Sequence, residues 1–328
     1  MIDGSDKHQK NNGLLDLCSK MLENRRLIVV SNRGPVEYHV STEGDLSPRR
    51  GTGGVVTALS TLANNVDFTW ISSAMGEGDR RIARENIGER ISSPIPGHTF
   101  SLKFVVTSRR VYHKFYNIFC NPLLWFLQHY MWSSPYTPNI DRSVYDAWEN
   151  GYLEVNKSFA DSIIEEASGA HDSPYVMIHD YHLYMVAGMV RKALPNAIIQ
   201  HLIHIPWPDP SYMQMLPAFI RTEICQSLLK NNIVGFQTLR DARNFLQSCE
   251  MFISDIEVDH NNFTVISGSN KTTVKAYPIG ISVAEVKGIS ESNRSVEYEK
   301  RLTPLFKGKT IVRIDRVEPS KNIIRGFR

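Results

Sequence analysis

Short runs of apolar residues, many of them β-branched, recur along the chain and predict strands that are buried on both faces. In the first half they lie at 27–30, 68–71 and 104–106. In the second half they lie at 175–178, 198–203, 233–236 and 271–277. Helical patterns lie at 14–24, 112–132, 145–168, 183–193, 220–230 and 241–249. The alternation in the second half predicts an α/β fold, with a Rossmann-like parallel sheet and helices on both of its faces.

The same patterns divide the chain into segments. Residues 1–24 are predicted as a polar N-terminal extension that ends in a short helix. Residues 25–286 form the main domain, and the polar stretch 287–299 is predicted as a linker. An apolar run at 310–314 predicts the first strand of a second α/β domain, of which 300–328 would be a truncated start. We therefore expect the chain to be a fragment of a longer protein.

The composition narrows the classes of partner. Lys and Arg number 37 and Asp and Glu number 34, so the formal net charge is 37 − 34 = +3 over 328 residues. This charge gives no general field for a nucleic acid or a membrane, so any anion site must be local. No apolar run approaches the ~18 residues of a membrane span. The four cysteines form no CxxC pair. Together with an N-terminus that lacks a signal-peptide core, they favour a cytoplasmic protein.

Polar residues directly follow two of the predicted strands, and open α/β sheets bind ligands at such strand ends. The segment 179–182 (HDYH) follows one strand and His204 follows the next. A carboxylate at Asp180 suits sugar hydroxyls, and an imidazole can hydrogen-bond or carry a proton. The alternatives are a helix cap at His182 and a buried structural histidine at His204. A metal site that includes both His201 and His204 is disfavoured, because these residues lie three apart on a strand and so point to opposite faces.

Two clusters of basic residues stand beside glycines or a helix start and could bind phosphate. Arg33 and the stretch 49–54 (RRGTGG) combine arginines with glycines, which permit close backbone approach at the start of a helix. The stretch matches neither a Walker A loop nor a GxGxxG fingerprint. Arg316 and Lys321 flank a Pro-Ser helix start and could clamp a diphosphate. The alternatives are a tight turn on a solvated basic surface and an ordinary charged helix start.

Two aromatic residues, Tyr116 and Trp125, lie in the long helical pattern at 112–132. A separation of nine positions places them about 180° apart on an ideal α-helix, at ~100° per residue. They would face one ligand only if the helix broke near Pro122, which has no backbone N–H. Otherwise both are expected in the core.

Each feature is weak by itself, but their order along the chain resembles the trehalose-6-phosphate synthase family. The matching motifs are SNR after the first strand, GTGGVV, FYNIFCNPLLW, WENGYLEVNKSFAD, IHDYH, HIPWP, GFQT, YPIGI and DRVEPSK. The resemblance implies the N-terminal half of a GT-B architecture, in which two Rossmann-like domains face a cleft. It also implies a retaining transfer of glucose from a nucleotide sugar, commonly UDP-glucose, to glucose 6-phosphate, with no metal and no cofactor.

On the acceptor side, the resemblance implies a role for each of four residues. Arg33 corresponds to the arginine that meets the acceptor phosphate, and Asp180 to the carboxylate that binds the acceptor hydroxyls. Tyr116 and Trp125 correspond to the aromatic pair beside that phosphate. The main domain would thus be the acceptor-binding domain, with Asp180 also implied in catalysis.

On the donor side, Gly53 and Gly54 correspond to the mobile glycine loop over the donor phosphates. His204 corresponds to the histidine near the donor sugar, and Arg316 and Lys321 to the pair on the nucleotide diphosphate. These last three residues are thereby also implied in catalysis. The implied mechanism needs no enzyme nucleophile, because the leaving diphosphate itself takes the acceptor proton.

The segment 70–81 departs from the tryptophan-rich segment of many synthases, which leaves the acceptor open. A similar divergence occurs in relatives that couple cyclitols, so a synthase for another phosphorylated acceptor is one alternative. A non-catalytic sugar-phosphate-binding module and a metal-dependent hydrolase built on 179–182 are the others. The sequence does not determine the oligomeric state, and a homo-oligomer is compatible with it.

Overall fold

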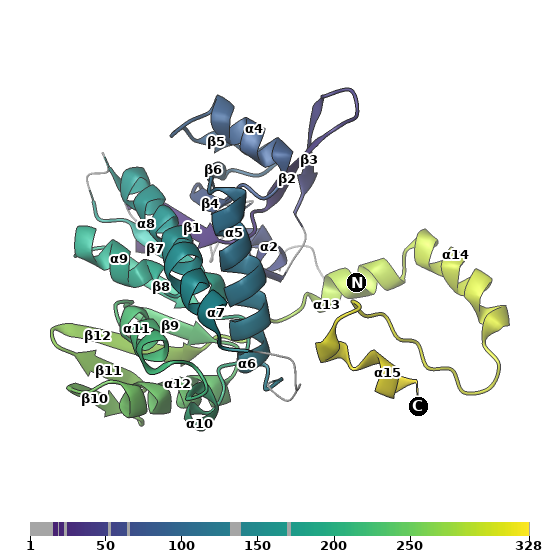
Figure 1. Ribbon diagram of the computed structural model, residues 1–328. Helices are drawn as coiled ribbons and strands as arrows, with labels where there is room; N and C mark the ends of the chain where they lie inside the picture. Colours follow the sequence, from purple (N-terminus) through teal and green to yellow (C-terminus); the bar gives the residue numbers. More distant parts are fainter. Residues whose placement is uncertain are drawn as a thin grey trace. The chain divides into compact units, whose positions relative to one another are not determined.

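The structure, a computed structural model, describes residues 16–18, 20–22, 25–51, 54–63, 66–131, 139–168 and 172–327. The chain divides into two compact units, Met1–Tyr277 and Pro278–Arg328. The first unit is an α/β domain built on one large, mostly parallel sheet (Figure 1). The predicted α/β fold class is therefore confirmed.

The large sheet has ten strands in the order β10-β11-β12-β9-β8-β7-β1-β4-β6-β5. Its parallel part contains β1 (Leu27–Ser31), β4 (Thr69–Ser73), β6 (Ser101–Val105), β7 (Tyr175–His179), β8 (Ile198–Leu202), β9 (Ile233–Phe236) and β12 (Asn270–Ala276). The antiparallel strands are β5 (Ile91–Ser92), β10 (Ile256–Asp259) and β11 (Thr264–Ser267). The seven strands predicted in this unit are the seven parallel ones.

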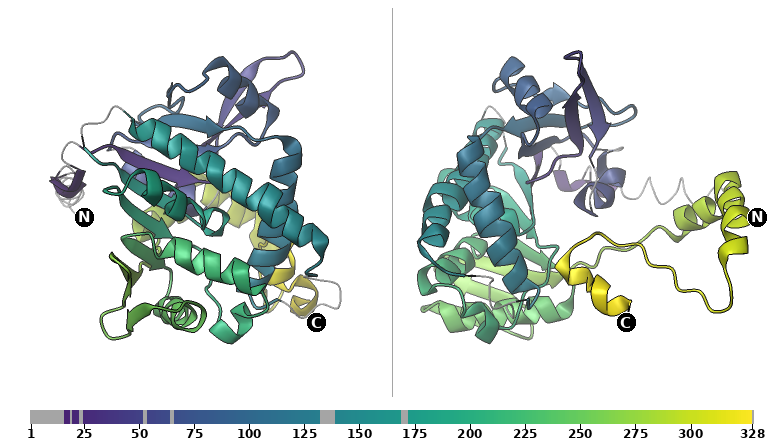
Figure 2. Two further views of the ribbon diagram at one scale, coloured as in Figure 1. Left: turned by 60° about the vertical axis from the view of Figure 1, so that its left-hand side comes forward. Right: turned by 45° about the vertical axis from the view of Figure 1, so that its right-hand side comes forward.

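The continuous apolar run of β1 explains why this strand lies in the interior of the sheet. Ile28 and Val30 belong to the core on one face of the sheet, and Leu27 and Val29 to the core on the other. The first core is covered by α8 (Glu154–Ala167), α9 (Val186–Ala193), α11 (Ala218–Leu228) and α12 (Leu239–Phe252). The second is covered by α2 (Gly54–Ala58) and α3 (Ser60–Ala63). Figures 1 and 2 show α8 running along the sheet.

The connections reverse their direction at β1. The chain passes from β1 to β4 and β6 on one side, and then returns to place β7, β8 and β9 on the other side. The carboxyl ends of β1 and β7 therefore lie at a topological switch point, where open α/β sheets form a ligand-binding crevice. This point positions the candidate site.

A two-stranded sheet, β2 (Val36–Val40) paired with β3 (Leu46–Arg50), was not predicted. Its second strand is mostly exposed and contains Pro48, so it lacks the apolar run that marks the other strands. The helix α4 (Glu77–Glu85) packs on β2, and a side chain on Gly78 would collide with the Tyr38 carbonyl group. Arg49 and Arg50 consequently lie on a strand, immediately before the glycine-rich stretch.

The predicted long helix at 112–132 is formed by three segments, α5 (Arg109–His113), η1 (Lys114–Trp125) and α6 (Phe126–Gln128). The break considered near Pro122 does not occur, because η1 is a π-helix that continues through this residue. A π-helix closes its turn with i→i+5 bonds, so nine residues make about two turns instead of two and a half. This winding reduces the angle between Tyr116 and Trp125 without a break, but the two rings contact different neighbours.

The remaining helices of this unit connect or cover the sheet. They are α7 (Arg142–Ala147), the π-helix η2 (Trp148–Leu153), the 3-10 turn η3 (Tyr181–Leu183) and α10 (Pro210–Met213). A side chain on Gly151 in η2 would lie 2.7 Å from the Lys114 Cβ, so glycine allows the two π-helices to approach closely. The described residues within the predicted helix 14–24, namely 16–18 and 20–22, are helical.

The second unit contains α13 (Val283–Ser290), α14 (Asn293–Leu302), η4 (Thr303–Leu305), η5 (Pro319–Lys321) and α15 (Ile323–Gly326). The strand predicted at 310–314 is wrong. Ile311 and Ile314 are 95% and 92% exposed, and no described strand pairs with this segment. An apolar run forms a buried strand only when neighbours complete its ladder. The predicted linker 287–299 falls largely on α13 and α14, and the proposed start of a donor domain at 300–328 stays a prediction.

No helix in the described part of the chain has the length and apolar character needed to cross a bilayer.

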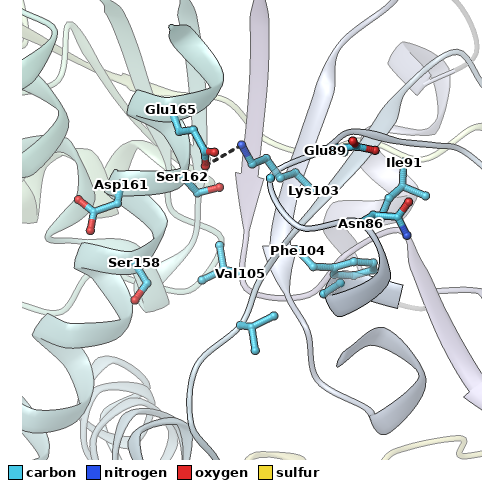
Figure 3. Close-up of a pocket in the computed structure, with 13 residues that line it drawn as sticks. Asn86, Glu89, Ile91, Lys103, Phe104, Val105, Ser158, Asp161, Ser162 and Glu165 are labelled. Atoms are coloured by element: carbon cyan, nitrogen blue, oxygen red, sulfur yellow. Dashed lines mark hydrogen bonds and ion pairs between the residues drawn. The ribbon is translucent and has the colours of Figure 1, made fainter. Parts of the chain in front are cut away.

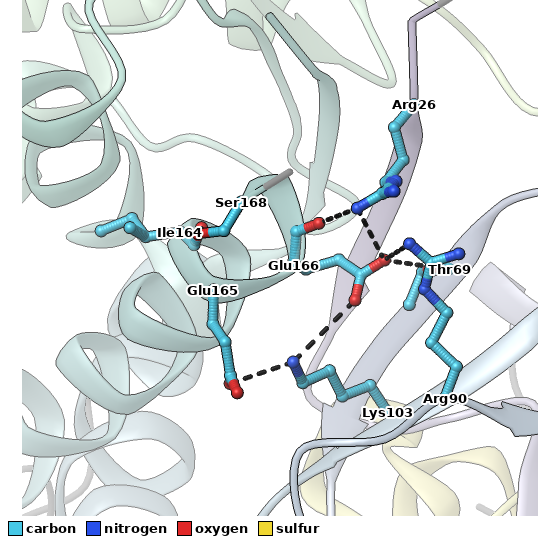
Figure 4. Close-up of polar contacts among 8 residues, drawn as sticks. All are labelled: Arg26, Thr69, Arg90, Lys103, Ile164, Glu165, Glu166 and Ser168. Atoms are coloured by element: carbon cyan, nitrogen blue, oxygen red, sulfur yellow. Dashed lines mark hydrogen bonds and ion pairs between the residues drawn. The ribbon is translucent and has the colours of Figure 1, made fainter. Parts of the chain in front are cut away.

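A buried carboxylate ties the amino ends of the central strands together (Figure 4). Glu166 at the end of α8 accepts a hydrogen bond from Thr69 Oγ1 at 2.7 Å and pairs with Arg90 at 2.8 Å. Arg26 and Lys103 lie 3.8 and 3.9 Å from its oxygens. The Glu166 side chain is only 4% exposed, so its charge depends on these partners.

We expect Glu166→Gln to lower the free energy of unfolding by about 3 kcal/mol, because the buried carboxylate is the shared counter-charge of Arg26, Arg90 and Lys103. The neighbouring Glu165 offers a matched control, since its side chain is 61% exposed although it pairs with Lys103. Glu165→Gln should cost less than about 1 kcal/mol. Urea unfolding of both variants tests this, and equal losses would contradict a structural role for the Glu166 network.

Candidate functional site

The carboxyl ends of β1 and β7 enclose a cavity of about 120 Å³ at the switch point. It is lined by Ser31, Asn32, Arg33, Gly54, Val55, Val56, His179, Asp180 and His182. Three residues singled out from the sequence, Arg33, Gly54 and Asp180, are thus brought together from segments far apart in the chain. His204 is joined to them by a hydrogen bond from its backbone N–H to Asp180 Oδ1, at 3.2 Å.

Two hydrogen bonds hold the loop that follows β1. Trp70 Nε1 donates to Ser31 Oγ at 2.8 Å, and that hydroxyl donates to the Arg33 carbonyl at 2.6 Å. A side chain on Gly34 would lie 2.5 Å from Ser72 Oγ, so only glycine permits this close approach. The Arg33 side chain remains exposed, where it can meet an anion.

Asp180 adopts a backbone conformation that non-glycine residues rarely adopt, with φ 72° and ψ 171°. Its N–H donates to the Leu202 carbonyl at 2.8 Å. Its carbonyl accepts from His201 Nε2 at 3.0 Å, and its carboxylate accepts from the His204 N–H. Such strain, of roughly 1–3 kcal/mol, persists where surrounding contacts over-determine it and is typical of functional sites.

Four histidines surround Asp180, and burial keeps them neutral. Burial lowers the pKa of His182 and of His201 to about 4. Burial also lowers the pKa of His204 and, together with the neighbouring His204 and His201, that of His179. His179 Nδ1 lies 3.0 Å from His204 Nε2, so the two rings share one hydrogen bond. No group of residues in the described ranges has the arrangement of a metal site.

Tyr116 of the π-helix belongs to a stack of rings that includes His182, a residue of the cavity lining. The ring of Tyr116 stacks on His182 at 5.8 Å and on Tyr112 at 5.7 Å. His182 in turn lies 3.9 Å from the ring of Tyr181. Trp125 instead packs on His129 at 4.2 Å. Neither Tyr116 nor Trp125 lines the cavity itself, and only Tyr116 contacts one of its residues.

Three predicted donor-side residues fall outside the described part of the first unit. Gly53 falls outside the described residues. Arg316 and Lys321 belong to the second unit, where both pair with Glu318, at 3.4 and 3.6 Å. Two cations that share one carboxylate form a local basic cluster, and their exposure leaves them accessible to an anion.

Two larger cavities lie elsewhere in the first unit. One of about 490 Å³ is lined by Lys103, Phe104, Asp161 and Glu165, among others, and Lys103 is occupied by its 3.0 Å pair with Glu165 (Figure 3). It contains none of the predicted site residues. The other, of about 460 Å³, is lined by Arg33 together with 37–40 and 75–79. Arg33 therefore borders both this cavity and the one at the switch point.

Sequence reasoning missed Asn32, Tyr112 and Gln237. Asn32 stands within the SNR motif and Gln237 within the GFQT motif, so these motifs pointed to both residues although no role was assigned. Tyr112 and Gln237 reach the site through contacts with Asn32 and His204, at 3.2 Å in each case. No sequence spacing predicts those contacts.

Comparison with known proteins places this arrangement in a family. Residues 25–328 match the family described as glycosyltransferase family 20. The chain belongs to glycosyltransferase family 20. The family resemblance expected from the motifs is thereby confirmed.

Curated relatives of this family-20 chain are longer than the chain itself. It is 32% identical over 303 residues to a UDP-forming alpha,alpha-trehalose-phosphate synthase A of Dictyostelium discoideum. The match covers 91% of this chain and 38% of that protein. It is 26% identical to a validamine 7-phosphate valienyltransferase of Streptomyces hygroscopicus subsp. jinggangensis, covering 92% of this chain and 60% of the relative.

Solved structures share the fold. A structure from E. coli described as trehalose-6-phosphate bound with UDP-2-fluoro glucose aligns with a TM-score of 0.65 at 22% identity. It covers 85% of this chain and 54% of the other. The N-terminal domain of Candida albicans trehalose-6-phosphate phosphatase aligns with a TM-score of 0.68 at 21% identity, covering 87% and 55%. The family-20 chain thus has the predicted fold of the N-terminal half of a GT-B protein.

The buried histidines predict that stability falls in mild acid. In the unfolded chain His182 and His201 have the ordinary pKa near ~6.5, so between pH 6.5 and about 4 only the unfolded chain binds their protons. Stability is full above this window and is lost as the pH falls through it, by up to about 1.4 kcal/mol per pH unit for each histidine.

Urea unfolding between about pH 7 and pH 5 measures this slope, above the range in which most carboxylates titrate. His201→Gln removes one of these groups and should make the slope shallower. A stability that is constant over this interval would contradict the neutral, buried state of these imidazoles.

Proposed function

We propose that this chain is the acceptor-binding part of a retaining glycosyltransferase that transfers glucose from a nucleotide sugar, UDP-glucose, to glucose 6-phosphate, giving trehalose 6-phosphate. One observation carries the proposal. Arg33 and Asp180 line a single cavity at the switch point, and His204 is hydrogen-bonded to the Asp180 carboxylate. The names of the relatives support the same substrates. The four free cysteines, Cys18, Cys120, Cys225 and Cys249, are consistent with a reducing cytoplasm, where we place the protein.

The chemistry of the cavity suits a phosphorylated sugar. The exposed Arg33 guanidinium offers charge-assisted hydrogen bonds to a phosphate. The Asp180 carboxylate accepts hydrogen bonds from sugar hydroxyls, and its strained backbone fixes the direction of that carboxylate. Tyr116, held against His182, and Trp125 of the same π-helix supply the apolar faces that we assign to the acceptor side.

The proposed transfer needs no protein nucleophile. Gly53 and Gly54 would lie over the donor phosphates, and Arg316 and Lys321 would stabilise the diphosphate as it leaves. The leaving diphosphate takes the proton of the attacking acceptor hydroxyl. His204, together with Asp180, positions the sugars, so the rate enhancement comes from orientation and electrostatics. These donor-side roles rest on the resemblance. We take the chain to be a fragment, because it spans 38% and 60% of two of its relatives.

A related synthase with another phosphorylated acceptor is the second candidate, and the cavity shared by Arg33 and 75–79 favours it. Asp79 accepts from the N–H groups of Tyr38, Met75 and Gly76 at 2.7–3.1 Å, which makes the divergent segment a fixed wall beside Arg33. The valienyltransferase relative points the same way. Assays of a longer protein with glucose 6-phosphate and with cyclitol phosphates separate the two acceptors. If that protein has a complete donor half and transfers to neither, a non-catalytic binding module is left.

We expect Arg33→Ala to weaken the binding of glucose 6-phosphate by about 1.5–3 kcal/mol, the range for a hydrogen bond to a charged group. Isothermal titration calorimetry measures the affinity. Arg142→Ala is a matched control, because Arg142 is an exposed arginine on α7 that does not line the cavity. An unchanged affinity in Arg33→Ala would remove this residue from the acceptor site.

We expect Asp180→Asn to reduce transfer in the complete enzyme at least tenfold while the free energy of unfolding changes by no more than about 1 kcal/mol. Asparagine preserves the shape and one acceptor oxygen for the His204 N–H, but it removes the charge. Rate and urea unfolding are measured on the same preparation. A loss of stability with a normal rate would assign Asp180 a structural role instead.

A further inference from the structure

Three buried polar atoms without a hydrogen-bond partner belong to residues that line the cavity at the switch point. They are Asn32 Nδ2, His179 Nε2 and His182 Nε2. Asn32 and His179 are only 3% and 1% exposed. An unpaired buried donor costs about 1–3 kcal/mol, so a group that pairs with it on binding recovers that free energy.

The amide of Asn32 is oriented by two hydroxyl groups. Its Oδ1 accepts from Ser73 Oγ at 2.9 Å and from Tyr112 Oη at 3.2 Å. With both acceptor positions of the oxygen used, the NH₂ group is directed away from these hydroxyls. Asn32 therefore offers a donor, and its orientation is set before any ligand arrives.

The tautomer of His179 is set by a chain of hydrogen bonds. Gln237 Nε2, which can only donate, lies 3.2 Å from His204 Nδ1, so this ring nitrogen accepts. A neutral imidazole carries one hydrogen, so that of His204 sits on Nε2 and points to His179 Nδ1 at 3.0 Å. The hydrogen of His179 must then sit on its unpartnered Nε2.

We propose that Asn32 Nδ2 and His179 Nε2 are unassigned binding residues that donate hydrogen bonds to a hydroxyl oxygen of the acceptor sugar. Both are neutral N–H donors, so they require an oxygen lone pair and exclude an ammonium group or a metal cation. The carboxylate of Asp180 lines the same cavity and accepts a hydrogen bond. A sugar hydroxyl can accept from these N–H groups and donate to Asp180, whereas the acceptor phosphate is assigned to Arg33.

Gln237 is then a positioning residue. It acts on the sugar through His204 and His179, because it determines which nitrogen of each ring carries the hydrogen. This inference rests on the proposed function, since it takes glucose 6-phosphate as the acceptor.

Binding of monodeoxy analogues tests the proposed donors. Asn32→Asp keeps an oxygen for Ser73 and Tyr112 but replaces the N–H donor with a carboxylate oxygen. Calorimetry with the whole chain should give at least a fivefold loss of affinity for glucose 6-phosphate. The loss should shrink to less than twofold for the one deoxy analogue that lacks the contacted hydroxyl. Asn86→Asp, in the 490 Å³ cavity, is the matched control and should leave all affinities unchanged.

The tautomer is read directly from ¹⁵N NMR of imidazole nitrogens in the wild-type chain, with His179→Gln to assign the signals. We expect the hydrogen of His179 on Nε2, and its signal should shift when glucose 6-phosphate is added. A hydrogen on Nδ1 would overturn the role of His179 and Gln237.

The two proposals fail in different ways. If glucose 6-phosphate binds in an Arg33-dependent manner but Asn32→Asp weakens every analogue equally, or none, the role of Asn32 is wrong and the proposed function stands. If the wild-type chain binds no glucose 6-phosphate, the proposed acceptor is wrong and this inference is overturned with it.

Discussion

The hydrogen bond from the His204 N–H to the Asp180 carboxylate joins the loops that follow two neighbouring strands, β7 and β8. The Asp180 N–H also donates to the Leu202 carbonyl, and the Asp180 carbonyl accepts from His201 Nε2. Three contacts to one segment make the positive φ of Asp180 tolerable, and they leave the carboxylate no freedom to turn away. The positions of His179 and His204 around the cavity follow from this connection.

The parallel strands of the large sheet were predictable because each one contains a run of buried apolar residues, whereas the antiparallel strands β5, β10 and β11 were not predicted. Leu27–Val30 is apolar at every position since both faces of β1 meet a core. The hairpin was not predictable from such a pattern, because β3 is exposed and interrupted by Pro48. The apolar run at 310–314, in contrast, was wrongly predicted as a strand. Its side chains specify a strand, but no described strand completes its ladder.

The residues of the candidate site were predictable where each belongs to a short motif directly after a strand. Arg33, Asp180 and His204 each follow a predicted strand, and parallel strands bring such ends to one edge. The contacts of Tyr112 and Gln237 were not predictable. Tyr112 lies 80 positions from Asn32 in the sequence, and Gln237 lies 33 positions from His204. Contacts over such distances depend on the folded topology. The π-helix was missed for another reason, since an apolar pattern does not distinguish five-residue from four-residue bonding.

That π-helix makes the length of the segment Lys114–Trp125 matter as much as its composition. Removing a single residue would favour ordinary winding and would rotate everything downstream by roughly a quarter turn relative to what precedes it. Tyr116 would keep its stack on His182, while Trp125 would rotate away from its present contact with His129. Among functional variants of this chain, we therefore expect deletions within this segment to be rarer than substitutions. This should hold even at positions whose side chains make no contacts.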